Sequence, residues 1–421
     1  MTLEATSPLE PVRRRRQAAM PFIMVTVLID MVSIGLILPV LPKLIGTFVQ
    51  TPAEQVAAYT WVSIAFALAN FVGAPVLGAL SDRYGRRPVL LLGFSGLAAT
   101  FFVTALATSL WMLVAVRVLS GLLEANITVA NAYVSDITEP AERARRFGMI
   151  GAMIGLGFIL GPTLGGLVGD TDVRLPFWWA GGLAVVNWIY GFFVLPESLP
   201  VDRRLALEWG RANPVGSLMH LSRLEGMTAL LIVIACASLS QFILQSTWAL
   251  YTQLKFGWGP WQIGESLCAV GVMSVIVQGV LVAPLTRWMS AQRLTVLGLL
   301  SSTLAFIAWG GAPQGWMMYV VIALNVLGFA AGAALQTLVA NSATPTTQGS
   351  TMGAVAGLAS LSAVIAPVVG LALLRAVANS PRGSWHFGAP YYLCALLQLG
   401  ALLALYFNRL QPYSGSARAS P

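Results

Sequence analysis

Long apolar stretches alternate with short polar ones along almost the whole chain. A helix needs about 20 apolar residues to cross the hydrocarbon layer of a membrane, and twelve runs of about that length lie between charges, Pro-Gly clusters and polar turns. The pattern therefore predicts an all-α polytopic membrane protein with twelve transmembrane helices. The expected spans cover residues 18–41, 57–80, 88–108, 109–133, 147–169, 176–196, 227–251, 263–285, 294–311, 316–340, 349–374 and 389–408.

Composition excludes an ordinary soluble enzyme. Of the 421 residues, 57% are hydrophobic and only 10% are charged, whereas a soluble protein carries roughly 25% charged residues. The segment Leu294–Leu374 contains no Asp, Glu, Lys or Arg. A net charge of +8 would suggest nucleic acid in a soluble protein, but here the basic residues lie between apolar segments. We therefore expect a lipid bilayer, and no nucleic acid, as partner.

The basic residues also indicate how the chain is oriented, because Lys and Arg are concentrated in the cytoplasmic loops of membrane proteins. Of those outside the spans, 18 fall on the side that holds both termini, including the run Arg13–Arg16. Five fall on the other side: Lys43, Arg174, Lys255, Arg375 and Arg382. Both termini are thus predicted to be cytoplasmic. The first apolar run lacks a small-residue cleavage pattern, so we interpret it as a retained span.

An internal repeat is the next feature of the pattern. A charged stretch, 197–225, separates six predicted spans from six others. At an offset of 205 residues, Gly and Pro positions recur in pairs: Gly93 with Gly298, Pro140 with Pro345, Gly148 with Gly353, Pro162 with Pro367 and Gly165 with Gly370. We predict an N-terminal six-helix bundle over 18–196, a cytoplasmic linker over 197–226, a C-terminal six-helix bundle over 227–410, and cytoplasmic tails over 1–17 and 411–421. Two such bundles form the framework of a large class of secondary transporters.

Three charged residues lie deep inside predicted spans, where each costs about 2.5–3.5 kcal/mol on insertion scales. Asp30 comes about twelve residues, or roughly 18 Å, into the first span, which places it near the middle of the membrane. Arg117 and Glu124 are seven residues apart in the fourth span. Seven residues are nearly two turns, so both side chains share a face that should look into the bundle or a cavity.

We interpret these three residues as a proton-coupling site. A buried carboxyl group can switch between neutral and charged forms, because burial and a nearby guanidinium group act on it in opposite senses. On this hypothesis Asp30, Glu124 or both take up and release a proton, with Arg117 as their fixed positive partner. The alternative is a permanent interhelical ion pair that only fixes packing.

The segment Gly78–Pro88, between the second and third spans, combines turn residues with charges. Gly85 permits a tight turn, Pro88 suits the first turn of the next helix, and Asp82 can pair with a nearby arginine. We interpret the segment as a gating loop on the cytoplasmic side, although a positive-inside loop would need only the arginines. Its assigned residues are Gly78, Asp82, Arg83, Gly85, Arg86 and Arg87.

A glycine stripe runs along the fifth predicted span. Glycines recur at every fourth position and Pro162 adds a local bend, which makes a smooth surface for close helix packing. Tight packing alone would explain the stripe; the functional question is whether the contact slides or loosens during transport. The residues of this motif are Gly157, Gly161, Pro162, Gly165 and Gly166, with Gly169 one turn further on.

Together these segments resemble the major facilitator superfamily, and within it the drug/proton antiporters close to the bacterial tetracycline efflux proteins. The resemblance covers nearly the whole chain and is strongest in Leu28–Pro42, Gly78–Pro88, Arg117–Gly121 and Gly157–Gly166. The segment Gly78–Pro88 is similar to the superfamily's gating motif, and Gly157–Gly166 is similar to the motif associated with antiport. The resemblance implies alternating access, in which two bundles rock around a central cavity and expel a lipophilic drug while a proton enters.

The resemblance also implies a location and a binding site. It predicts a multi-pass protein of the cell inner membrane that acts as a monomer on a small molecule and protons. The cavity is expected between the first, fourth, seventh and tenth spans, and Asp30 and Arg117 match acidic and basic positions of the tetracycline branch. The predicted substrate-binding residues are Gln241, Gln245, Trp248, Gln278, Asn325 and Gln336. The alternative is that these residues only pack the helices together, since polar side chains can join helices by hydrogen bonds.

The chain departs from that branch at several positions. The branch tends to carry a histidine where this chain has Ser274, and acids near Thr100 and Ser302. Conversely, Glu124 stands where the branch usually has a small residue. These differences leave the substrate open, with a tetracycline-like drug as one option, and suggest that proton handling has moved to Glu124.

Other functions are less well supported by the residues. Proton-coupled uptake would use the same fold and buried acid, and a non-transporting sensor would lack proton coupling. An enzyme, a metal site or another cofactor is not expected, because Cys236, Cys268 and Cys394 lie far apart and only His220 and His386 could join them.

Overall fold

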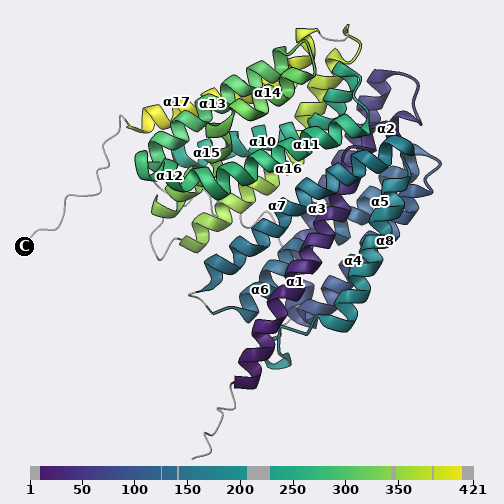
Figure 1. Ribbon diagram of the computed structural model, residues 1–421, viewed down its shortest axis with the longest axis vertical. Helices are drawn as coiled ribbons and strands as arrows, with labels where there is room; N and C mark the ends of the chain where they lie inside the picture. Colours follow the sequence, from purple (N-terminus) through teal and green to yellow (C-terminus); the bar gives the residue numbers. More distant parts are fainter. Residues whose placement is uncertain are drawn as a thin grey trace, which may run out of the picture. The chain divides into compact units, whose positions relative to one another are not determined.

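The computed structural model describes residues 10–124, 126–139, 142–205, 228–342, 348–381 and 384–409. Within these ranges the regular structure is helical and contains no β-strand, which confirms the all-α prediction. Eleven of the described helices are long and apolar enough to cross a membrane, or twelve when one bent pair is counted as a span. The chain is therefore a multi-pass membrane protein (Figure 1).

The predicted spans correspond to the following helices in chain order. The first six are α1 (Glu10–Ile37, followed by the short α2, Leu41–Gly46), α3 (Pro52–Tyr84), α4 (Arg86–Ala105), α5 with α6 (Leu110–Leu123 and Asn126–Ile137), α7 (Arg143–Thr171) and α8 (Leu175–Val194). The other six are α10 (Thr228–Phe256), α11 with the π-helical segment η4 and α12 (Pro260–Ile276, Val277–Leu281 and Val282–Trp288), α13 (Ala291–Gly311), α14 with α15 (Trp316–Leu324 and Val326–Ser342), α16 (Gln348–Val377) and α17 (Ala389–Arg409). Two short 3-10 segments complete the list, η2 (Val201–Arg203) and η5 (Trp385–Gly388).

Polar residues set the ends of several helices. Thr51 and Glu54 form a reciprocal capping box at the start of α3, where each side chain accepts a hydrogen bond from the other residue's backbone N–H. The side chains of Ser109 and Ser290 accept from backbone N–H groups at the starts of α5 and α13. These caps satisfy donors that a helix start leaves unpaired, so each helix begins at a defined residue.

The chain divides into two compact units. Met1–Pro214 and Gly257–Gly271 form the first unit, and Val215–Phe256 and Val272–Pro421 form the second. In the first unit α1 packs against α7 and α8, and α4 packs against α8. In the second, α10 packs against α16 and α17, and α13 packs against α17. Each unit therefore repeats the same pattern of neighbours, with the first span of each unit packed against its fifth and sixth.

The linker and tails that we predicted lie mostly outside the described residues. Residues 197–205 are described and include η2, while 206–227 are not. Helix α1 already begins at Glu10, within the segment predicted as the N-terminal tail. Residues 260–271 of α11 are grouped with the first unit rather than with the second, because they pack on α7.

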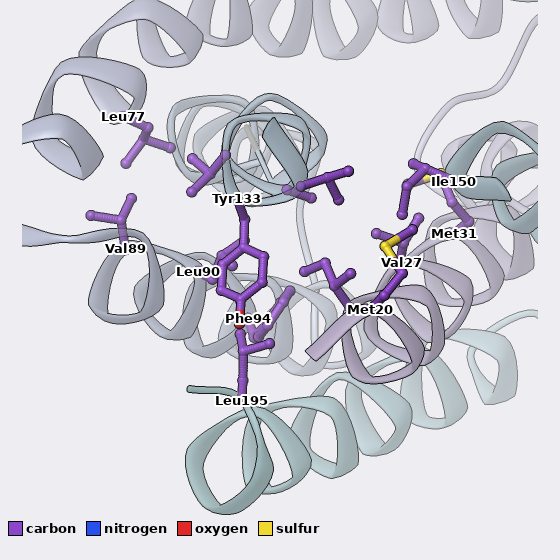
Figure 2. Close-up of a cluster of buried hydrophobic side chains, with 14 residues drawn as sticks. Met20, Val27, Met31, Leu77, Val89, Leu90, Phe94, Tyr133, Ile150 and Leu195 are labelled. Carbon is purple, nitrogen blue, oxygen red and sulfur yellow. The ribbon is translucent and has the colours of Figure 1, made fainter. Parts of the chain in front are cut away.

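A buried apolar cluster from α1, α3, α4, α6, α7 and the end of α8 forms the core of the first unit (Figure 2). Met20, Val27 and Met31 of α1 belong to it, as do Phe94 of α4 and Tyr133 of α6. Tyr133 places its hydroxyl 2.9 Å from the Pro196 carbonyl oxygen, to which it donates. Because Asp30 lies between two members of this cluster in α1, the core determines how that carboxyl group is placed.

Candidate functional site

Asp30 is buried inside the first unit, with 4% of its surface exposed. Its Oδ1 accepts a hydrogen bond of 3.0 Å from Nδ2 of Asn126, the first residue of α6. Thr26 and Phe94 are among the residues that surround both side chains. The acid that we expected near the middle of the first span is thus surrounded by protein and held by one amide.

Glu124 lies at a break in the fourth span. Helix α5 ends at Leu123, and the backbone of Glu124 departs from helical geometry with φ −89° and ψ 48°. The Glu124 carboxylate accepts a hydrogen bond of 3.1 Å from the Ser120 hydroxyl, one turn earlier in α5. The carboxyl group is therefore fixed to the helix that ends there.

Arg117 is partly buried on α5, with its guanidinium carbon 6.0 Å from the centre of the Phe66 ring. It interacts electrostatically with Glu124, but the two do not form an ion pair within the described part of the chain. The three residues of the predicted proton-coupling site therefore lie in one unit, on α1 and α5. Proton coupling itself stays a prediction.

The predicted gating loop is a tight turn between α3 and α4. Gly85 has φ 105°, which favours glycine, and a Cβ atom there would lie 2.3 Å from a Glu197 carboxylate oxygen. Arg86, only 8% exposed, pairs with the Asp82 carboxylate and donates from Nε to the Asp136 carboxylate at 3.0 Å. The Asp82–arginine pair that the sequence suggested thus extends to a second acid on α6.

The other residues of the loop differ in their surroundings. Arg87 donates to the Phe192 carbonyl oxygen and stacks on that ring, with 5.6 Å between guanidinium carbon and ring centre. Arg83 is exposed and stacks on the neighbouring Tyr84 ring at 5.2 Å. At Gly78 a Cβ atom would meet nothing within 4 Å, so close packing does not explain this glycine.

Sequence reasoning missed two acids that hold the gating loop. Asp136 lies in the last turn of α6, and Glu197 stands where we placed the start of the linker. The Glu197 carboxylate accepts from the backbone N–H groups of Arg86 (2.9 Å), Arg87 (3.3 Å), Ser198 (2.9 Å) and Leu199 (3.0 Å). It therefore caps the start of α4 from 111 residues away in the chain. The signal available in the sequence was the position of Glu197, an acid that directly follows the sixth predicted span.

The glycine stripe packs α7 closely against α1. A Cβ atom at Gly157 would lie 2.4 Å from Met31 Cβ, and one at Gly161 would lie 2.6 Å from Gly35 Cα. A Cβ atom at Gly165 would lie 2.0 Å from the Leu36 carbonyl oxygen. The glycine stripe therefore contacts residues 31–36 of α1, which directly follow Asp30 in the chain.

Gly166 lies on another face of α7 and packs against α11. A Cβ atom there would lie 2.6 Å from the Pro260 carbonyl oxygen, and one at Gly264 would lie 2.3 Å from the Pro162 carbonyl oxygen. The two glycines face each other, with a Cβ on either one 3.1–3.2 Å from the other's Cα. Helix α7 is thus packed at backbone distance against both α1 and α11.

The predicted substrate-binding residues fall into two groups. Gln241 and Gln245 on α10, Gln278 in η4 and Gln336 on α15 are exposed. Gln278 donates to the Ser274 hydroxyl at 2.6 Å. Their role in binding a substrate stays a prediction.

The remaining two are buried in the second unit. Trp248, 3% exposed, packs edge to face on Trp309 with 5.4 Å between ring centres. Asn325 lies at the break between α14 and α15, which bend by 47°, and its Oδ1 accepts a 2.9 Å hydrogen bond from the Ser301 hydroxyl.

Lys255 is a buried charge that we had placed on the outer side of the membrane. It lies in the last turn of α10, is 1% exposed, and donates to the Tyr251 hydroxyl (2.9 Å) and to the Gly310 carbonyl oxygen (2.7 Å). Its ammonium nitrogen also lies 5.4 Å from the centre of the Phe256 ring. A lysine near the end of α13 stabilises that helix C-terminus.

These features define a membrane transporter rather than an enzyme: the two helical units have the same internal arrangement, acids are buried within spans, and amides are exposed on helices of the membrane region. Residues 23–367 match the family model of the Major Facilitator Superfamily. The chain belongs to this family.

Several characterised proteins are similar to this chain. It is 33% identical over 380 residues to the class C tetracycline resistance protein of Escherichia coli, covering 90% of this chain and 95% of that one. It is 34% identical over 375 residues to the class G tetracycline resistance protein of Vibrio anguillarum, covering 87% and 93%. The human organic anion transporter MFSD10 shares the fold with a TM-score of 0.68 at 23% identity, covering 95% of this chain and 100% of that one. The nucleoside transporter NupG does so with a TM-score of 0.73 at 12% identity, covering 93% and 99%.

Proposed function

We propose that this protein exports a lipophilic drug, with a tetracycline-like compound as the first candidate, in exchange for protons by alternating access. The observation that carries the proposal is the pair of carboxyl groups within the spans of the first unit, Asp30 and Glu124, in a chain similar to tetracycline resistance proteins. Under this proposal each transport cycle takes up protons on one side and releases them on the other as the drug leaves.

The two acids are suited to carry protons because a charge inside the membrane region is expensive and a neutral acid is not. Asp30 has an amide partner and Glu124 a hydroxyl partner, and neither forms an ion pair among the described residues. A permanent ion pair that only fixes packing would need a direct contact with Arg117. The geometry therefore favours the proton-coupling role over the packing role.

Exposed amides support a polar substrate path through the second unit. Gln241 and Gln245 lie one turn apart on α10, inside a candidate span, and both are exposed. An amide facing hydrocarbon would lose its hydrogen bonds at a cost of several kcal/mol, so we place these side chains toward a water-filled cavity. Gln278 and Gln336 are assigned to the same surface. Trp248 and Asn325 would pack beneath this surface, because both are buried.

The location and assembly of the protein follow from the same proposal. We place it in the cell inner membrane with both termini cytoplasmic, on the strength of the uneven distribution of Lys and Arg. We propose further that it acts as a monomer, with the first six spans and the last six as the two bundles that rock. Residues 197–226 would connect these bundles on the cytoplasmic side.

Everted membrane vesicles with an imposed proton gradient test this function directly. Addition of tetracycline should trigger proton release in the wild type, and the Asp30→Asn and Glu124→Gln variants should lower the initial rate about tenfold or more if each acid carries a proton. Binding of the drug to the purified protein should change far less than the rate. Glu142→Gln provides a control, because Glu142 is an exposed acid whose ion-pair partner among the described residues is Arg146, one turn further on.

Each outcome separates the alternatives. Proton release lost in only one variant identifies the coupling acid. Drug accumulation that runs with the proton rather than against it would favour uptake by symport. If no compound in a broad panel of lipophilic drugs moves protons in the wild type, export is refuted, and a sensor of the same fold becomes the better explanation.

A further inference from the structure

The fourth span is interrupted at Glu124, and an asparagine contacts each side of the interruption, Asn70 of α3 on one side and Asn126 of α6 on the other. Helix α5 ends at Leu123 and α6 begins at Asn126. The interruption has no proline, and a helix end leaves its last carbonyl groups without partners in the helix. These carbonyls must be satisfied by a neighbouring side chain or by water.

Asn70 of α3 supplies that contact. Its Nδ2 lies 3.1 Å from the Glu124 carbonyl oxygen and 3.4 Å from the Gly121 carbonyl oxygen. The two backbones are pressed together here, since a Cβ atom at Gly121 would lie 2.5 Å from the Phe66 carbonyl oxygen. The end of α5 is thus fixed to α3, and with it the position of Glu124.

Asn126 ties the other side of the interruption to Asp30. The residue is 5% exposed, and its Nδ2 donates to Asp30 Oδ1 at 3.0 Å. Its Oδ1 occupies the space that a side chain at Gly93 would fill, because a Cβ atom there would lie 2.0 Å from it. The amide is therefore held between α1 and α4. Because Gly93 has no side chain, it does not restrict rotation of the amide.

An amide can serve both protonation states of the acid that it contacts. When Asp30 is ionised, the Asn126 NH2 group donates to the carboxylate; when Asp30 has taken a proton, its O–H can donate to the amide oxygen instead. The two acids are also close enough to interact electrostatically, and Arg117 on α5 interacts with Glu124. Tyr59 on α3 is the other titratable group that interacts with Arg117.

We propose that Asn126 is the positioning residue that transmits the protonation of Asp30 to the interruption of the fourth span, with Asn70 as the fixed anchor on the Glu124 side. This inference rests on the proposed function, since it assumes that Asp30 carries a proton. Rotation of the Asn126 amide changes the hydrogen bond that connects the first turn of α6 to Asp30. Asn70 meanwhile keeps the last turn of α5 in place. The protonation states of Asp30 and Glu124 are then coupled, so the two acids are not independent sites.

The test compares Asn126→Thr with Asn126→Val, because the threonine and valine side chains have nearly the same shape. Only threonine keeps a group that both donates and accepts, so it should retain most of the tetracycline-triggered proton release in everted vesicles, while valine should lower that rate about tenfold. Exchange of labelled for unlabelled tetracycline, which needs no net proton movement, should stay within about twofold of the wild type in both variants. A role in packing alone would make Thr and Val equal in both assays.

Two further variant sets keep the test decisive. Asn187 of α8 is the matched control, because it is also buried and donates to α1, at the Thr26 carbonyl oxygen (3.1 Å), without touching the interruption. Asn187→Thr and Asn187→Val should not differ. In the Asp30→Asn background, Asn126→Val should cause no additional loss of proton release, since its effect passes through Asp30.

Equal rates for Asn126→Thr and Asn126→Val, or additive losses with Asp30→Asn, would overturn the inference. Failure of the proposed function looks different, because the wild type itself would then release no protons on addition of drug. Asn70→Leu should resemble Asn126→Val, with normal exchange and reduced proton release, and normal proton release in Asn70→Leu would remove Asn70 from the proposal.

Discussion

Single carboxylates join distant segments at the gating loop of the first unit. Glu197 accepts four backbone N–H groups, and Asp136 accepts from both Arg86 and the Ser198 hydroxyl (3.1 Å). These contacts connect the turn between α3 and α4 with the ends of α6 and α8. The loop is therefore a structured element, which a purely electrostatic anchor of basic residues would not require.

Replacing Glu197 by glutamine should destabilise this element. One carboxylate oxygen becomes an NH2 group that cannot accept from a backbone N–H, so the start of α4 loses part of its cap at a cost of about 1 kcal/mol. Thermal unfolding of the purified protein should begin at a lower temperature, and transport should fall as well. The same change at Glu142, an exposed acid, should leave both unaltered; equal effects at the two positions would contradict the capping role.

At the scale of whole helices, the two units share an interruption in the same span. The fourth span breaks at Glu124 and the tenth at Asn325, where φ is −81° and ψ is 36°. A polar side chain from a neighbouring span contacts each break, Asn70 in the first unit and Ser301 in the second. Interrupted helices at corresponding positions of two repeats are the best pointer to a binding site in transporters of this kind.

Helix α7 is the other element with a specific packing role, since it contacts α1 on one face and α11 on another. A methyl group at Gly264 would have to displace the Pro162 backbone, so Gly264→Ala should cost about 2 kcal/mol and reduce transport. Thermal unfolding and vesicle transport check both effects. Gly151→Ala in α7 is the control, because a Cβ atom there meets nothing within 4 Å. Unchanged transport in Gly264→Ala would show that this contact has no part in the cycle.

For the molecule as a whole, orientation in the membrane is the main prediction. With 18 basic residues on one side of the predicted spans and five on the other, the N- and C-termini should both be cytoplasmic. A fluorescent protein fused to the C-terminus should fluoresce, and alkaline phosphatase fused there should be inactive. An alkaline phosphatase fused after Leu106, at the end of the third span, should be active instead. The reverse result at the two positions would invert the topology.

Hydrophobic patterning was sufficient to predict the approximate number and position of the spans and the all-α class, because hydrocarbon tolerates only helices whose backbone groups are satisfied internally. The family was predicted from the resemblance of motifs such as Gly78–Pro88 and Gly157–Gly166. The same cost of burying charge marked Asp30, Arg117 and Glu124 as functional candidates. Turn residues marked the predicted gating loop as a turn, since Gly85 does adopt the positive φ that its position suggested.

Only the tertiary structure revealed the partners of these residues. Asn126 and Asp30 are 96 positions apart, and Glu197 and Arg86 are 111 apart. An asparagine inside an apolar helix looks like any other polar residue in the sequence, because its hydrogen-bond partner depends on which helix packs beside it and at what height. The break at Glu124 was hidden for the same reason: no proline or local pattern marks it, and contacts with α3 and α1 hold it in place.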